Sequence, residues 1–131
     1  MNSPMHSRPL SPHLQVYRFM LTMALSIFHR MTGAGLYFGS LIFVWWLVAA
    51  AMGPEAYGQF MAIAGSIVGR VVLFGLSFAI LHHMLGGLRH LVWDTGRGFN
   101  LKCVEISARV LVASSLSLTI GLWLLAYWIR G

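Results

Sequence analysis

Residues 71–88 read VVLFGLSFAILHHMLGGL, an uncharged and mostly apolar run that contains two adjacent histidines, His82 and His83. A run of this length approaches the roughly 20 residues of helix that cross a bilayer about 30 Å thick. Lipid offers the backbone no hydrogen-bond partners, so a segment that spans it is α-helical. Ionisable side chains in such a run are costly and are usually kept only where they face a partner or a cofactor. The run therefore predicts a transmembrane helix with a functional site within it.

Two further apolar stretches flank this run and give expected spans at about 27–53, 66–93 and 108–129. The composition agrees, because 58% of the 131 residues are hydrophobic and only 9% are charged, against about 25% in soluble domains. The alternating period of a membrane β-barrel is lacking. We expect an all-α membrane protein in which residues 1–131 form a single domain. Its transmembrane helices follow a short N-terminal arm, residues 1–25, in which Pro4, Pro9 and Pro12 oppose a long helix.

The positions of the charged residues indicate the topology. The formal net charge is +6. Cations gather before and at the start of the first span and around the loop between the second and third, at Arg8, Arg18, Arg30, Arg89, Arg97, Lys102 and Arg109. The other loop holds only Glu55, with Arg70 just inside the second span. This positive-inside pattern predicts an inside N-terminus and an outside C-terminus, and it argues against a nucleic-acid-binding surface.

The first 17 residues lack the apolar core of a signal peptide and the Arg-rich pattern of a transit peptide. We therefore expect a multi-pass protein of a bacterial inner membrane, with a cytoplasmic N-terminus, rather than an imported mitochondrial one. The single cysteine, Cys103, cannot form an internal disulfide and suits a reducing compartment.

One stripe of the second expected helix carries His83, His90 and Asp94, which lie within about 40° of one another at 100° per residue. Gly87 shares the stripe, whereas His82 is turned away from it. At 1.5 Å per residue, His83 lies about 16 Å and His90 about 6 Å inside an inner boundary near Asp94. The stripe thus runs from the inner surface to the middle of the membrane.

A second polar group is expected at the inner end of the first span. Ser26, His29 and Arg30 share a helix face there and are expected to lie level with the shallower residues of the stripe. They would place a hydroxyl, an imidazole and a guanidinium at the inner rim. We therefore expect a polar pocket at the rim with one deep histidine beneath it.

A deep, neutral imidazole is a good axial ligand for haem iron. The haem propionates would favour the rim, where His29, Arg30, Arg89 or His90 can pair with them. The competing interpretation is that His83 hydrogen-bonds a neighbouring helix. His29, the only histidine of another span, is expected about 10 Å too shallow to ligate the same iron. The second ligand is therefore expected from another subunit.

Three stretches of the chain carry a resemblance to a known family. They are 8–14 (RPLSPHL) with Tyr17 following, 26–33 (SIFHRMTG) and 83–94 (HMLGGLRHLVWD). In order, spacing and three-span layout the chain resembles the large cytochrome b subunit of the succinate dehydrogenase membrane anchor, in respiratory complex II. The last two patterns together are highly specific, and the resemblance covers essentially the whole chain.

The resemblance implies a haem b held between this subunit and a second small anchor subunit, each giving one histidine. In the family's register the ligand is His83, although the neighbouring His82 leaves the choice open by one residue. The resemblance also implies that Ser26 and Arg30 contribute to a ubiquinone site, and that His29 and Arg30 approach the haem propionates.

We interpret the chain as the cytochrome b anchor of a succinate:quinone oxidoreductase. It has no flavin fingerprint and no cysteine cluster for iron–sulfur centres, so succinate oxidation would belong to flavoprotein and iron–sulfur partners docked on the inside. It would contribute to quinone reduction without a catalytic residue for succinate. One alternative is a haem-free structural anchor of the same complex. Another is a small proton or solute carrier, which is disfavoured because the outer half of the membrane holds little beyond small hydroxyls.

Overall fold

The computed structural model describes residue 16 and residues 18–131, in which four α-helices follow one another. They are α1 (Leu21–Met52), α2 (Pro54–Ala64), α3 (Ile67–Asp94) and α4 (Leu101–Arg130), and this part of the chain holds no strand. The expected arm and the 8–14 motif fall in residues 1–15 and 17, outside the described residues. The all-α architecture expected from the sequence is confirmed.

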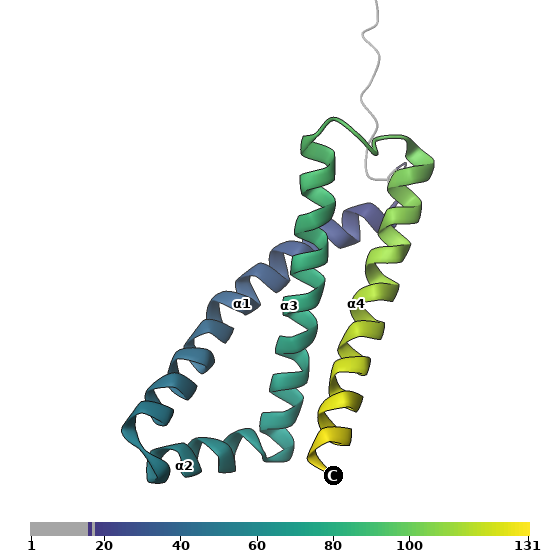
Figure 1. The fold of residues 1–131 in the computed structure, drawn as a ribbon. Coiled ribbons are helices and arrows are strands. Elements are labelled where there is room, and N and C mark those ends of the chain that lie inside the picture. Colours follow the sequence, from purple (N-terminus) through teal and green to yellow (C-terminus); the bar gives the residue numbers. More distant parts are fainter. Residues whose placement is uncertain (1–15, 17) are drawn as a thin grey trace, which may run out of the picture.

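The three long helices form the body of the molecule (Figure 1). α3 and α4 run side by side, and the first turns of α1 pass behind α3 to reach α4. From this crossing α1 and α3 diverge, and α2 closes the gap between their far ends. We call this far end the α2 end. The opposite end, where residues 95–100 join α3 to α4, is called the loop end.

Each long helix can cross a membrane by length and composition: α1 has 32 residues, α3 has 28 and α4 has 30. Large apolar side chains remain exposed along all three, including Tyr37, Val71 and Trp128. Soluble monomers rarely expose contiguous apolar surface on this scale. Lipid or partner helices must therefore cover these faces.

Two helices extend beyond the expected spans, and one was not expected. α1 begins at Leu21, so residues 21–25 belong to the helix and the expectation that they form part of the arm is wrong. α4 begins at Leu101, where the Asn100 side chain accepts a 2.9 Å hydrogen bond from the Lys102 amide. α2 begins at Pro54 after Gly53, whose φ of 107° favours glycine. Pro54 in its first turn and Glu55 beside it are typical of a helix start.

A small core ties the loop-end half together. Leu25 of α1 packs against Ala108 and Leu111 of α4. Deeper in the bundle, the buried hydroxyls of Ser115 and Thr119 donate hydrogen bonds to carbonyl oxygens of their own helix, at 3.0 and 2.7 Å. These hydroxyls are thereby satisfied within α4, which suits a close contact with α3.

Candidate functional site

Three histidines meet where α1 crosses α3. The rings of His29 and His83 are stacked, with centroids 4.0 Å apart and planes 17° apart. The His90 ring packs edge-on against His29, with centroids 5.2 Å apart. Among the residues that the structure describes, no three His, Cys, Asp or Glu side chains are arranged to hold a metal ion by themselves. The cluster therefore suits a single protein ligand to a cofactor better than a bare metal site.

His83 is oriented by α1. Its Nδ1 lies 3.1 Å from the carbonyl oxygen of His29 and 3.3 Å from the hydroxyl oxygen of Thr32. The Thr32 hydroxyl itself donates to the His29 carbonyl at 2.9 Å. A ring nitrogen facing a carbonyl carries the proton and donates it, so the other nitrogen, Nε2, holds the lone pair. Nε2 has no hydrogen-bond partner in the described part of the chain, which leaves it free to bind a metal.

Glycines allow the two helices to approach this closely. A Cβ added at Gly33 would lie 3.0 Å from Cε1 of His83, and one added at Gly86 would lie 2.5 Å from Cδ2 of His29. Gly87 is different, because a Cβ there would meet nothing within 4 Å. Gly33 and Gly86 thus make room for the histidine rings, and Gly87 leaves open space one helical turn from His83.

The expected depth of His29 is wrong. The sequence placed it at the rim, about 10 Å from the level of His83, but the two rings are stacked and His29 Nε2 lies 3.3 Å from the His83 carbonyl oxygen. The cause is that α1 crosses α3 obliquely, so that its third turn, which holds His29, meets the middle of α3. Even so, stacked rings face one another and cannot occupy opposite faces of one haem.

Ser26 and Arg30 lie together on α1 but away from the histidine stack. Both are exposed, whereas Leu25 and Thr32 on the opposite side of the helix are buried. Neither side chain has a hydrogen bond or ion pair with the described residues. They present a hydroxyl and a guanidinium on an open face of α1 beside the crossing with α3, where a ligand or another subunit can reach them. His90 and Asp94 are exposed closer to the loop end.

His82 points to a different neighbour from His83. Its ring is 2% exposed and is enclosed by Phe28 and Phe78, with ring centroids 5.2 and 5.4 Å away. Its Nδ1 lies 3.1 Å from the Ser115 hydroxyl of α4. Its Nε2 is buried without a partner among the described atoms. No space for a porphyrin adjoins this ring.

Arg89, one of the residues expected near a carboxylate, is engaged with α4 instead. Its guanidinium donates to the Ser107 hydroxyl and to the Val104 carbonyl, both at 3.0 Å, and lies 4.1 Å from the centre of the Trp93 ring. Thr32 was not singled out from the sequence, although its position three residues after His29 puts it on the same helix face.

Comparison with known proteins bears on this arrangement. Residues 5–122 match the family described as "Succinate dehydrogenase/Fumarate reductase transmembrane subunit". A "Succinate dehydrogenase cytochrome b556 subunit" of Rickettsia felis is 37% identical over 118 residues, which cover 90% of this chain and 92% of that one. The protein of the same name from Paracoccus denitrificans is 41% identical over 114 residues, covering 87% and 88%. A "Succinate dehydrogenase cytochrome b560 subunit, mitochondrial" of Sus scrofa is 33% identical over 121 residues, covering 88% and 70%.

Proposed function

Because the chain belongs to the family of succinate dehydrogenase/fumarate reductase transmembrane subunits, we propose that it is a cytochrome b anchor that holds haem b together with a second anchor subunit. Relatives from bacteria are named for a cytochrome b556. These relatives and the three spans support a multi-pass protein of a bacterial inner membrane. Its N-terminus lies on the cytoplasmic side in our proposal, following the positive-inside distribution.

His83 would hold the haem iron in this proposal. The observation that carries it is the pair of contacts at Nδ1, to the His29 carbonyl and the Thr32 hydroxyl. Such contacts fix the tautomer and the ring orientation of metal-binding histidines and raise their basicity. The open space at Gly87 supports room for a flat ring beside them. When bound, haem b takes up and releases single electrons.

Two exposed side chains beside the histidine stack would hold the propionates. Arg30 follows His29 on α1 and the His90 ring packs against His29, so both can pair with carboxylates there. His29 contributes in two ways: its carbonyl orients His83, and its ring lies between His83 and His90, where a propionate can approach it. Since His29 cannot be the opposite ligand, the second anchor subunit supplies that histidine.

Ser26 and Arg30 would form this subunit's part of the ubiquinone site. Arg30 has no ion-pair partner in the described chain, so its guanidinium is available to donate hydrogen bonds to a quinone carbonyl oxygen. It would stabilise the negative charge that grows on that oxygen as electrons arrive. Ser26, one turn earlier, would bond the quinone or a water and help to relay protons. The open face of α1 lets a long-tailed quinone enter from the bilayer.

The flavoprotein and iron–sulfur subunits would dock at the loop end. Cations gather there, at Arg18, Arg97 and Lys102, and all three are exposed. Docking at this end would bring the electron donors to the half of the bundle that holds Arg30 and the histidine stack, which would shorten the route of electrons to the quinone. This subunit would supply no group for succinate oxidation itself.

A reduced-minus-oxidised spectrum of the co-purified complex tests the proposal against a haem-free anchor. We expect a b-type absorption band at a ratio of one haem per flavin. The contrary result would be a complex that assembles with both soluble subunits and transfers electrons to quinone without showing this band. That result would leave the anchor role intact and remove the haem assignment.

A further inference from the structure

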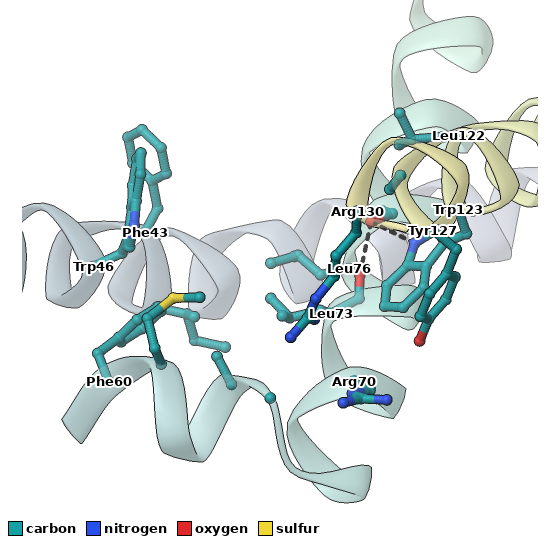
Figure 2. A pocket seen from close by; sticks show the side chains of 16 residues that line it. Phe43, Trp46, Phe60, Arg70, Leu73, Leu76, Leu122, Trp123, Tyr127 and Arg130 are labelled. Atoms are coloured by element: carbon teal, nitrogen blue, oxygen red, sulfur yellow. Dashed lines mark hydrogen bonds between the residues drawn. The ribbon is translucent and has the colours of Figure 1, made fainter. Parts of the chain in front are cut away.

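A large pocket lies at the α2 end, far from the histidine stack. Its volume is about 510 Å³, and all four helices contribute to its lining. The lining is mostly apolar and aromatic, with Trp46, Phe60, Trp123 and Tyr127 among its residues. Figure 2 shows Phe43, Trp46 and Phe60 on one side of it and Trp123 and Tyr127 on the other. Neither haem nor the quinone site, as proposed above, uses this pocket.

Two arginines line the same pocket. Arg70 lies in the first turn of α3 and Arg130 ends α4. Both are labelled in Figure 2, on the side nearer Trp123 and Tyr127. The only ion pair within the described ranges joins Arg109 to Glu105, so neither arginine has a carboxylate partner there. Both side chains are exposed, so their guanidinium groups are open to an anion that enters the pocket from outside the described chain.

A smaller hollow between α1 and α3 adjoins the pocket. The hollow has a volume of about 250 Å³ and shares Ile42 and Leu76 with the pocket. Its lining includes Gly35 and Gly75, where an added Cβ would meet nothing within 4 Å. An acyl chain that passes Ile42 and Leu76 from the pocket would enter this hollow and run towards the middle of the membrane.

We propose that the pocket binds one anionic phospholipid, with its phosphate between Arg70 and Arg130 and an acyl chain in the hollow between α1 and α3. The charges are complementary, because the pocket offers two cations and the lipid brings the missing anion. The pocket also lies at a suitable depth in the membrane, because tryptophan and tyrosine rings such as those in its lining are typical of the level of the lipid headgroups. An apolar helix of the second anchor subunit would fill the pocket equally well, but it would not bring a negative charge to the two arginines.

Lipid binding to the purified complex tests the proposal. After delipidation in detergent, native mass spectrometry follows the binding of dioleoylphosphatidylglycerol and, separately, of dioleoylphosphatidylcholine. We expect the anionic lipid to bind more tightly. Replacing both arginines (Arg70→Gln with Arg130→Gln) should weaken its binding by about twenty-five-fold, at about fivefold for each cation. The matched control Arg109→Gln removes an exposed arginine of α4 that does not line the pocket, and it should leave the affinity unchanged.

Two further variants separate the occupants. Gly75→Leu fills the hollow without touching the arginines, so it should weaken phospholipid binding, whereas a bare phosphate site would not respond. Ala126 lies in the lining of the pocket, and Ala126→Cys places a thiol there. Cross-linking of this thiol to the second anchor subunit would show that a partner helix occupies the pocket. The proposal is overturned by that cross-link, by equal affinity for the two lipids, by unchanged binding in the double arginine variant, or by unchanged binding in Gly75→Leu.

Discussion

Gly86→Ala tests the close crossing of α1 and α3 on which the histidine geometry depends. The new Cβ would lie 2.5 Å from Cδ2 of His29, whereas carbon atoms in contact rest about 3.5–4.0 Å apart. The imidazole must therefore move by about 1 Å or more. It has little freedom to do so, because it stacks on His83 at 4.0 Å and its Nε2 lies 3.3 Å from the His83 carbonyl oxygen.

Overpacking of this kind typically costs about 1–3 kcal/mol, which corresponds to about a five- to 150-fold change in an equilibrium. The matched control is Gly121→Ala in α4, where the added methyl group meets nothing within 4 Å. Alanine is also the better helix former by up to about 1 kcal/mol. The same chemical change should thus be harmful at the crossing and harmless away from it.

The assay uses purified complexes and measures the haem-to-flavin ratio and the rate of thermal inactivation of succinate:ubiquinone reductase activity. We expect Gly86→Ala to lose haem or to inactivate several-fold faster, and Gly121→Ala to match the wild type in both. If Gly86→Ala matched the wild type as well, α1 and α3 would not approach as closely as the structure has them. If both variants were damaged equally, the effect would not come from the contact with His29.

Three other outcomes are expected. Arg30→Lys should lower the rate of ubiquinone reduction by about a hundredfold, and Ser26→Ala should lower it less. Succinate oxidation by an artificial acceptor should persist in both variants. Normal quinone reduction in assembled Arg30→Lys complexes would contradict the quinone role. Thr32→Val should raise the haem midpoint potential in a redox titration, because His83 loses a contact at Nδ1 and becomes a weaker donor to iron; an unchanged or lower potential would count against that role. Reporter fusions after Gly131 should be active only as outside reporters, and an inside-active fusion would reverse the topology.

The helices could be predicted because lipid leaves the backbone no alternative. Apolar runs of sufficient length in a membrane protein must be helical, so the spans around 27–53, 66–93 and 108–129 follow from composition alone. α2 was missed because an 11-residue helix at a membrane surface lacks a long apolar run. Pro54 and Glu55 carry a start signal that a search for short helices would have found.

The relative depth of residues on different helices could not be predicted. A helical wheel gives the faces of one helix but neither its tilt nor its starting level, and His29 was placed about 10 Å from His83 for that reason. The two adjacent histidines show the same limit. The wheel separates His82 from His83 by about 100°, but only the structure shows that α4 lies on the side of His82 and α1 on the side of His83.

The most direct test of the haem assignment compares His83→Ala with His82→Ala by the reduced-minus-oxidised spectrum of the purified complex, normalised to its flavin. His83 has an Nε2 without a hydrogen-bond partner among the described residues, whereas His82 is 2% exposed and packed between Phe28, Phe78 and α4. We predict that His83→Ala abolishes or strongly shifts the haem b band and that His82→Ala largely preserves it. A normal band in His83→Ala, with the loss in His82→Ala instead, would contradict the assignment of His83 as the ligand.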